Sequence, residues 1–292
     1  MPTYHYFYNR YFFAGNYRPS LHLPGLTQTS SREGLLQADC VVVHLPSILS
    51  TNLADQLARL RSTAPARQIW VAESLESAVN FPQMDDPKFM ALFNIEVSYR
   101  QSADIWTPYI PTNLPEDYAK VTIGSRKKNL CAFISSNWDE SGRRAYVRDL
   151  FRHLDVHSYG KFMRNKRLLL DRGISTKLRV MKKYAFTLAF ENSIETDYVT
   201  EKFYQPLMSG CIPVYLGAPN IGDFAPGERC FVNACDFETP ARLADFIKQA
   251  DPEEFQSWRR HDLRPSFKNL MKRIEYNWQY QLAELILRHL ST

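Results

Sequence analysis

Short apolar runs alternate with amphipathic segments along most of the chain. Near the start, three runs are apolar enough for buried strands and a helical repeat lies between the first two: Val41–Leu45, Gln68–Val71 and Ile95–Tyr99, with the helix at Leu53–Arg61. A second set of strand-like runs comprises Leu130–Ile134, Val156–Tyr159, Phe186–Phe190, Cys211–Leu216 and Cys230–Val232. Helical segments separate them at Arg143–His153, Lys177–Lys183 and Val199–Met208. Because strands alternate with helices, the pattern predicts an α/β fold with parallel sheets in two Rossmann-like halves.

The Pro-containing segment Pro108–Ser125 is the natural linker between these halves. A length of 292 residues also favours about two domains, each large enough to bury its own core. We therefore expect one half over residues 1–120, a second half over residues 126–255, and a C-terminal helical segment over residues 256–292. The spacing of aromatic and leucine residues in that last segment predicts a helix. Packing back onto the first half is one arrangement for it, which sequence alone does not show.

The segment Tyr184–Asn220 has the most informative pattern of polar positions. Its first strand ends at the polar run Glu191–Ser193, in the position where α/β sheets usually place their ligands. Thr196 or Asp197 is expected to cap the helix that follows, and Gly210 is expected to end it.

Tyr198, Glu201 and Lys202 lie in or near the first turn of that helix and point away from its apolar face. A helix N-terminus carries roughly half a positive charge and free N–H groups, so it suits an anion. A lysine at this end costs roughly a few tenths of a kcal/mol unless an anion offsets it. The pattern favours a bound phosphate or diphosphate, the alternative being an ordinary solvated Glu–Lys pair on a surface helix.

Charge and hydropathy exclude several classes of protein. The net charge of +5 is modest, and the densest basic runs, Arg126–Lys128 and Lys161–Arg167, are short and accompany no zinc or RNP-type motif. Solvated surface, or attraction to an anionic nucleotide, is therefore favoured over a nucleic-acid interface. No run approaches 18 apolar residues, so no membrane span is expected, and the N-terminus lacks the apolar region of a signal peptide.

The cysteines indicate neither a disulfide framework nor a metal centre. Their number is odd, and the pair spaced as Cys-x₄-Cys has no second half: Cys40, Cys131, Cys211, Cys230 and Cys235. The chain also contains no Asp-x-Asp motif through which a metal could hold a nucleotide, Glu195–Asp197 being the nearest imitation. We expect a reducing compartment and no required metal.

Five ordered segments share the sequence pattern of one known family. They are FNIEVSYRQSADIWTPY (Phe93–Tyr109), CAFISSNWDESGRRAYVRDL (Cys131–Leu150), HSYGKF (His157–Phe162), FENS followed by DYVTEK (Phe190–Lys202) and FVNACDFETPARLADFI (Phe231–Ile247). In these segments the chain resembles the α1,3/4-fucosyltransferases of glycosyltransferase family 10. The resemblance implies the GT-B architecture, two Rossmann-like halves with parallel sheets facing across a cleft. It also implies an acceptor-binding half over 1–120, a GDP-fucose-binding half over 126–255, and inverting fucosyl transfer without a required metal.

The resemblance nominates a set of donor-binding residues. In the family pattern an arginine, here Arg143 or its neighbour Arg144, acts with Lys202 on the diphosphate, and Glu201 suits the ribose hydroxyls. The whole predicted set is Arg143, Tyr159, Glu191, Asn192, Ser193, Tyr198, Glu201 and Lys202.

Three members of this set have ordinary structural alternatives. Arg143 could be a surface arginine at the start of a helix. Tyr159 with Gly160 either lines the guanine side of the pocket or forms a simple turn. Glu191 lies either near the fucose or only caps the loop.

The resemblance also places the catalytic base in the acceptor half, at Glu73. A carboxylate at a strand end, partly desolvated, can have a raised pKa and accept the proton of the attacking hydroxyl. The sequence reads Glu73-Ser74-Leu75 where the family has a proline, and Glu76 follows closely. Glu76, a plain surface role for Glu73, and His44 as a rival base remain the alternatives.

These features together predict a GDP-fucose-dependent α1,3-fucosyltransferase. The expected acceptor is the 3-hydroxyl of GlcNAc or glucose in N-acetyllactosamine and Lewis-type glycans. Alternatives are a GT-B transferase of another nucleotide sugar and a non-catalytic glycan- or nucleotide-binding protein. We expect a monomer that binds GDP-fucose and a glycan, with no nucleic-acid partner. We also expect a cytoplasmic, bacterial-type enzyme, or a Golgi-lumenal one if the sequence is a truncated secretory protein.

Overall fold

The protein is described by a computed structural model that covers residues 1–8, 21–29, 31–50, 54–111, 127–134, 139, 141–168, 170–260 and 263–291. It divides into two compact units, Met1–Pro108 with Ile274–Thr292, and Tyr109–Arg273. The predicted boundary between residues 120 and 126 lies outside the described residues. The C-terminal stretch expected from residue 256 onward is shared, because residues 256–273 belong to the second unit and residues 274–292 to the first.

The first unit is built on a parallel sheet, six-stranded over the described residues, with strand order β2-β1-β3-β4-β5-β6. Its strands are β1 (Thr3–Phe7), β2 (Thr27–Thr29), β3 (Cys40–His44), β4 (Ile69–Ser74), β5 (Ile95–Ser98) and β6 (Ile105–Trp106). The three predicted runs form β3, β4 and β5, and these are the central strands, where a parallel sheet is covered on both faces. The sequence pattern did not predict β1 and β2, which extend the sheet beyond β3, or β6, which extends it beyond β5.

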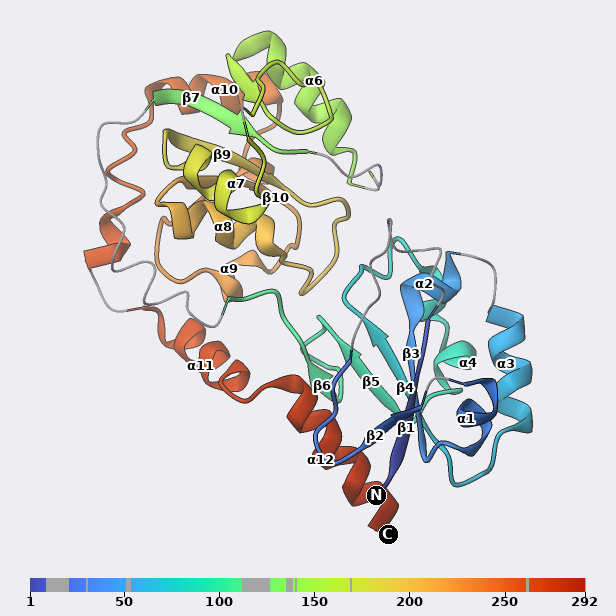
Figure 1. The fold of residues 1–292 in the computed structure, drawn as a ribbon. Coiled ribbons are helices and arrows are strands. Elements are labelled where there is room, and N and C mark those ends of the chain that lie inside the picture. Colours follow the sequence, from blue (N-terminus) through green and yellow to red (C-terminus); the bar gives the residue numbers. More distant parts are fainter. Residues whose placement is uncertain are drawn as a thin grey trace. The chain divides into compact units, whose positions relative to one another are not determined.

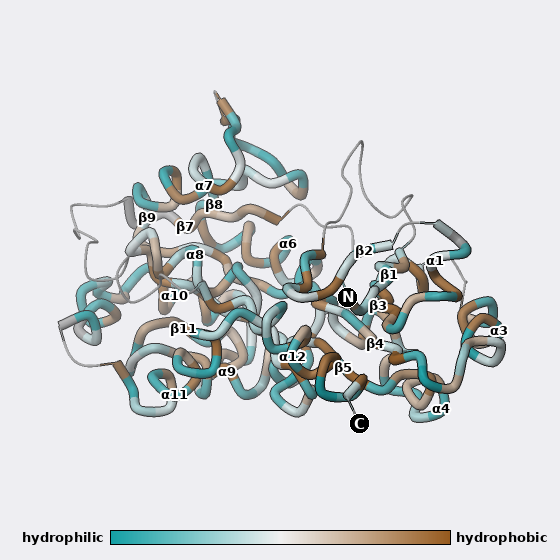
Figure 2. The backbone as a smooth tube through the Cα atoms, turned by 60° about the horizontal axis from the view of Figure 1, so that its bottom comes forward, coloured by the Kyte–Doolittle hydropathy of each residue, from teal (hydrophilic) through white to brown (hydrophobic). Residues whose placement is uncertain are grey.

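Helices surround this first sheet (Figure 1). In several of them hydrophilic and hydrophobic residues alternate along the helix (Figure 2). They are α1 (Arg32–Gln37), α2 (Leu45–Leu49), α3 (Ala54–Thr63), the 3₁₀ turn η2 (Pro82–Asp85), α4 (Pro87–Met90) and α12 (Trp278–Ser291). Through Leu282, Ala283 and Ile286, α12 enters the same core as β4 and β5. The C-terminal helix therefore packs onto the first half, an arrangement that the sequence alone could not show.

The second unit is also built on a parallel sheet, five-stranded over the described residues, with strand order β11-β10-β9-β7-β8. Its strands are β7 (Lys127–Ala132), β8 (Val156–Ser158), β9 (Tyr184–Phe190), β10 (Ile212–Leu216) and β11 (Val232–Asn233). All seven residues of β9 are buried, so the strand lies at the centre of the sheet. From β7 the chain first moves outward to β8 and then returns past β7 to β9, which makes the carboxyl edge between β7 and β9 a topological switch point.

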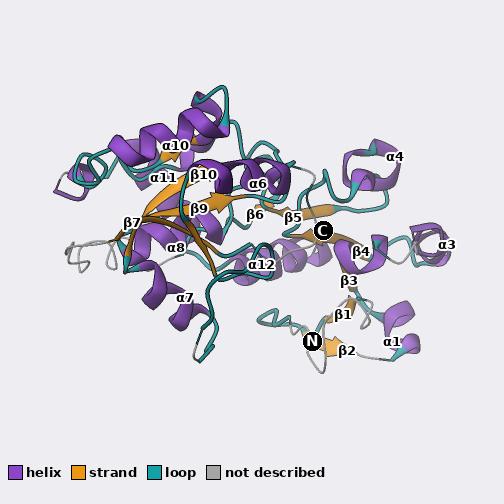
Figure 3. Ribbon diagram, turned by 90° about the horizontal axis from the view of Figure 1, so that it is seen from above, coloured by secondary structure: helices purple, strands orange, loops and turns teal. Residues whose placement is uncertain are grey.

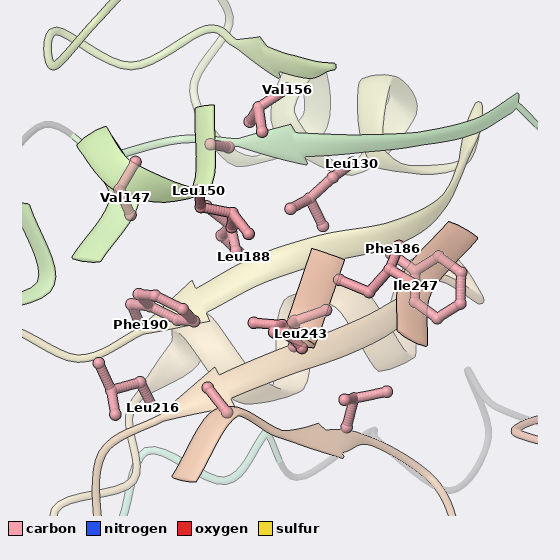
Figure 4. Packing of buried hydrophobic residues seen from close by; sticks show 14 of the residues in the cluster. Leu130, Val147, Leu150, Val156, Phe186, Leu188, Phe190, Leu216, Leu243 and Ile247 are labelled. Atoms are coloured by element: carbon pink, nitrogen blue, oxygen red, sulfur yellow. The ribbon is translucent and has the colours of Figure 1, made fainter. Parts of the chain in front are cut away.

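Two layers of helices enclose this second sheet (Figure 3). The helical elements of the unit are α6 (Arg143–His153), α7 (Ile174–Met181), α8 (Glu201–Ser209), α9 (Ile221–Phe224), η3 (Ala234–Asp236), α10 (Pro240–Gln249), η4 (Ser257–Arg260) and α11 (Pro265–Ile274). One layer contains α6 and α10, and the other contains α7 and α8. Figure 4 shows apolar side chains of α6 and α10 meeting those of the strands: Leu130, Val147, Leu150, Val156, Phe186, Leu188, Phe190, Leu243 and Ile247.

The start of α8 corrects the prediction that Thr196 or Asp197 caps it. The helix begins at Glu201, and its N-cap is Thr200, whose hydroxyl accepts from the Lys202 N–H. Asp197 has a left-handed backbone (φ 67°) and exchanges two 2.9 Å hydrogen bonds with Asn220, which holds this stretch as a loop. The predicted end is confirmed, because Gly210 has φ 70° and caps the helix.

Candidate active site

A pocket of about 820 Å³ lies at the carboxyl edge of the second sheet. Its walls come from the residues that follow β7 and β8, the end of β9, the first turns of α6 and α8, and the segment from residue 161 to α7. Gly160 permits the close approach of these strand ends, because a Cβ there would lie 2.5 Å from the Ile134 nitrogen. The pocket therefore sits at the switch point, the usual ligand position in open α/β sheets.

The pocket is strongly basic. Its described lining contains two acids, Asp171 and Glu201, against six cations: Arg143, Lys161, Arg164, Arg167, Lys177 and Lys202. Three of these cations come from the basic run Lys161–Arg167, for which attraction to an anionic nucleotide was one expectation. A lining with this excess of positive charge suits a ligand that carries two phosphates.

Arg143 is fixed at the pocket by its neighbours. Its side chain is 1% exposed, its Nη1 donates to the Phe190 carbonyl (3.1 Å), and its Nε lies 3.8 Å from Asp139 Oδ1. Burial lowers the pKa of this arginine, and the carboxylates of Asp139 and Glu191 oppose that shift. Arg144 instead lies over the Phe162 ring, 5.4 Å from its centroid, and is not part of the lining. Of the two arginines left open by the sequence, the pocket contains Arg143.

Glu191, Thr200 and Lys202 form a buried network under the start of α8. Both carboxylate oxygens of the fully buried Glu191 are used, by the Thr200 N–H (2.8 Å), the Thr200 hydroxyl (2.8 and 2.9 Å) and Lys202 Nζ (3.2 Å). Burial raises the pKa of Glu191, against the pull of Lys202. The anion that the sequence argument required for Lys202 is thus supplied in part by the protein.

Lys202 and Glu201 connect this network to the pocket, since both line it. Burial alone would lower the pKa of Lys202, but the carboxylates of Glu191 and Glu201 outweigh it and raise the pKa. Burial would raise the pKa of Glu201, but Lys202 and Lys177 outweigh it and lower that pKa. Lys202 is therefore a cation and Glu201 a carboxylate at neutral pH.

The remaining predicted donor residues divide into one wall residue and three that do not line the pocket. Tyr159 lines it, stacks on Phe133 (centroids 5.3 Å apart, planes at 16°) and bonds the Tyr184 hydroxyl through its own (2.7 Å). The side-chain oxygens of Asn192 and Ser193 are buried without a hydrogen-bond partner in the described part of the chain. Tyr198 packs edge-on against Tyr109. Glu191, Asn192, Ser193 and Tyr198 are not part of the described lining, and the donor-binding roles of all eight residues stay predictions.

Sequence reasoning missed Lys177, on α7, and Thr200, which organises the start of α8. Lys177 reaches the pocket beside Phe133, with its Nζ 5.7 Å from the ring centroid, and burial lowers its pKa. No local pattern distinguishes it from other lysines on an amphipathic helix.

Glu73, the predicted base, lies in the first unit within β4, one residue before the strand ends. It is 7% exposed, its Oε2 accepts from the Tyr6 hydroxyl (3.2 Å), and burial raises its pKa to about 7 against that hydrogen bond. His44 lies beside it on β3, but its Nδ1 accepts from the Ser47 N–H at the start of α2, and burial lowers its pKa to about 4. His44 is therefore a neutral capping residue, and Glu73 has the properties of a base near neutral pH.

Family profiles match both units of the chain. Residues 20–110 match "Fucosyltransferase, N-terminal", and residues 124–284 match "Glycosyltransferase family 10 (fucosyltransferase) C-term". The chain belongs to glycosyltransferase family 10. The second match contains the whole basic pocket, and the first contains Glu73.

Curated relatives include two α1,3-fucosyltransferases. Alpha-(1,3)-fucosyltransferase B of Drosophila melanogaster is 33% identical over 217 residues, which are 67% of this chain and 49% of that protein. The 4-galactosyl-N-acetylglucosaminide 3-alpha-L-fucosyltransferase 9 of Mus musculus is 30% identical over 235 residues, 79% of this chain and 61% of that protein. This family 10 chain thus spans about half to three fifths of the length of the curated relatives it matches.

A solved structure supports the fold of this family 10 chain. The "Crystal Structure of alpha1,3-Fucosyltransferase with GDP-fucose" superposes with a TM-score of 0.54 at 15% identity, over 86% of this chain and 80% of the other. The predicted α/β fold of the GT-B class, with a Rossmann-like parallel sheet in each half, is confirmed. In the described part of the chain, no helix is both long and apolar enough to cross a membrane.

Proposed function

We propose that this chain transfers L-fucose from GDP-fucose to the 3-hydroxyl of GlcNAc, or of glucose, in glycans of the N-acetyllactosamine type. The observation that carries the proposal is the basic pocket at the switch point of the second sheet, within the part that matches the family 10 profile. Its lining offers six cations for a nucleoside diphosphate and an aromatic wall at Tyr159 for a base.

In this proposal Arg143 and Lys202 bind the diphosphate and stabilise the charge that develops on GDP as the fucosyl bond breaks. The bond from Arg143 Nη1 to the Phe190 carbonyl fixes the guanidinium plane, so no reorganisation is needed when the charge appears. Lys202 is held by Glu191 and supplies charge at the start of α8. Glu201, ionised beside Lys202, accepts from the ribose hydroxyls. These fixed cations take the place of a divalent metal.

Glu73 is the general base of the proposed reaction. The acceptor 3-hydroxyl attacks C1 of fucose from the side opposite GDP, its proton passes to the Glu73 carboxylate, and GDP leaves with the electron pair of the broken bond. A pKa of about 7 makes the ionised form available at neutral pH while keeping it basic enough to take the proton. The acceptor identity, the monomeric state and the cytoplasmic location stay predictions from the sequence.

GDP should stabilise the protein in a buffer that contains a metal chelator. At a GDP concentration about 100-fold above Kd, binding adds about 2.7 kcal/mol to the free energy of unfolding of the second unit, so its unfolding temperature should rise by several degrees. Differential scanning fluorimetry measures this shift. UDP at the same concentration is the control for a transferase of another nucleotide sugar and should stabilise less. Stabilisation that requires added Mg²⁺ or Mn²⁺ would contradict the role given to Arg143 and Lys202.

Tyr6→Phe should shift the pH profile of transfer upward. The Tyr6 hydroxyl donates to Glu73 and holds down the pKa of the base, so its removal raises that pKa further. The acidic limb of kcat/KM against pH should move up by about 1 to 2 pH units, the value of one hydrogen bond to a charged group. Tyr8→Phe is the matched control: it removes a hydroxyl from the ring that packs against Tyr6, with centroids 5.4 Å apart, and the acidic limb should stay where it is in the wild type. If the acidic limb does not move in Tyr6→Phe, Glu73 is not the group whose ionisation produces that limb.

A further inference from the structure

Asp171 is an unexpected residue on the wall of the basic pocket. The described lining contains two acids. The other one, Glu201, has an ion-pair partner, because its Oε1 lies 3.6 Å from Lys202 Nζ. Asp171 forms no ion pair with any described cation, although six cations share the pocket with it. Its Oδ1 accepts from the Gly173 N–H (2.9 Å), and no further hydrogen bond of this side chain occurs among the described residues.

A carboxylate in this position weakens the attraction of the pocket for phosphate. The side chain is exposed to solvent, its negative charge repels any nucleoside diphosphate that enters, and no ion pair with a described cation offsets that charge. What it offers a ligand is acceptor capacity: the free Oδ2 and the second lone pair of Oδ1 both accept hydrogen bonds. Asp171 therefore suits a part of the ligand that presents N–H donors and carries no charge.

Asp171 and the proposed phosphate-binding pair come from different elements of the pocket wall. The phosphate-binding pair Arg143 and Lys202 belongs to the first turns of α6 and α8. Asp171 belongs to the segment between β8 and α7, which starts at Tyr159 and the aromatic stack with Phe133. Of the described lining residues in this segment, Asp171 is the one that offers a carboxylate acceptor to a base packed against the aromatic wall.

Guanine is the base whose edge matches a carboxylate. Its N1–H and its exocyclic 2-amino group are adjacent donors, and two parallel donors meet the two oxygens of a carboxylate in the geometry of a bidentate pair. Uracil presents a single N–H on that edge, and adenine presents one donor beside an acceptor. We propose that Asp171 accepts hydrogen bonds from N1–H and the 2-amino group of guanine, and that it selects GDP over other nucleoside diphosphates. This inference rests on the proposed use of GDP-fucose by the same pocket.

The test is isothermal titration of the full chain with GDP, IDP and UDP. IDP carries hypoxanthine, which keeps N1–H and lacks the 2-amino group. The wild type should bind GDP more tightly than IDP. In Asp171→Ala, GDP affinity should fall by about 10- to 100-fold, the value of hydrogen bonds to a charged group, and the preference for GDP over IDP should disappear. UDP should bind the same variant slightly more tightly, because a repelling charge has been removed.

Two further variants separate recognition from general effects. Asp171→Asn keeps one acceptor oxygen and should retain part of the preference for GDP. Asp149→Ala removes one acid from the exposed face of α6, where Asp149 contacts Arg152 and His153, and should leave all three affinities unchanged.

The opposite sign of change would overturn the inference. If Asp171 is only a charge at the rim, Asp171→Ala binds GDP, IDP and UDP more tightly in parallel, and the wild-type ratio of GDP to IDP survives. Absence of GDP binding to the wild type would instead refute the proposed function, and this outcome is recognised before any variant is measured.

Discussion

Glu73→Gln should lower kcat for fucosyl transfer by about 10²- to 10⁴-fold while leaving the affinity for GDP unchanged. Glutamine keeps the shape of the side chain and can still accept from the Tyr6 hydroxyl, but it cannot take up the proton of the acceptor. The loss should therefore appear in kcat, measured at saturating GDP-fucose. Isothermal titration with GDP provides the binding measurement.

The folding stability of Glu73→Gln should depend on pH differently from that of the wild type. Burial raises the pKa of Glu73 from 4.5 to about 7, so between these values the folded state binds more protons than the unfolded state. The wild type therefore loses stability as pH rises through this window, on the order of 3 kcal/mol from this one group. Glutamine does not titrate, so Glu73→Gln should gain stability relative to the wild type at pH 8 and show little gain near pH 4.5.

Two glutamate variants control this experiment. Glu96→Gln makes the same chemical change on the neighbouring strand β5 and should keep both the wild-type kcat and the wild-type response to pH. Glu76→Gln tests the rival base. An unchanged kcat in Glu73→Gln, or a larger loss in Glu76→Gln, would show that Glu73 is not the base.

Lys202→Met should produce the second large effect, a loss of both stability and donor binding. Removing the ammonium leaves the fully buried Glu191 without its charge partner, which costs up to about 3 kcal/mol of folding stability. The cost falls at the low end of the range for broken buried pairs, because Thr200 still donates two hydrogen bonds and Lys202 is 26% exposed. Loss of a cation from the diphosphate site should reduce kcat/KM for GDP-fucose by about 10²- to 10³-fold.

A double variant distinguishes these two consequences. In Lys202→Met with Glu191→Gln, the buried carboxylate is no longer charged, and thermal unfolding should return most of the way to the wild-type temperature. GDP affinity and kcat/KM should stay low, because the cation is still absent. Lys248→Met, which breaks the exposed pair with Asp245 on α10, is the matched control and should change neither. A double variant that binds GDP as the wild type does would restrict Lys202 to a structural role.

The central strands could be predicted because their burial is complete. Runs such as Val41–Val43 and Ile212–Leu216 are buried on both faces. A short, continuous apolar run of this kind is typical of the inner strands of a parallel sheet. The bounds predicted for α6, Arg143–His153, are those of the structure. The edge strand β2 has only three residues and no buried member, so it left no apolar run to find.

The site could be predicted only where its residues fall in the segments that share the family pattern. Arg143, Tyr159, Glu201 and Lys202 lie in such segments, and the pocket contains all four. Lys177 and Asp171 follow β8, and they reach the same pocket because β8 lies next to β7 and β7 next to β9. That adjacency depends on the strand order of the sheet, which hydrophobic periodicity does not specify.

The start of α8 was mispredicted for a related reason. Thr196, Asp197 and Thr200 are all good N-caps by residue type, and the choice among them depends on partners elsewhere in the chain. Asn220 holds Asp197 in the loop, and Glu191 holds Thr200 at the cap. The ion pair between Lys202 and Glu191 shows that part of the charge attributed to a bound anion belongs to the protein itself.

The most direct test of the central claim is a transfer assay with GDP-fucose and N-acetyllactosamine in a buffer that contains a metal chelator. The product is detected by mass spectrometry, and its linkage is assigned by NMR. We predict a product one fucosyl unit heavier, linked to the 3-hydroxyl of GlcNAc, and no product from the isomer whose galactose already occupies that hydroxyl. Absence of product with every fucose acceptor of this class, from a protein that GDP does not stabilise, would contradict the account.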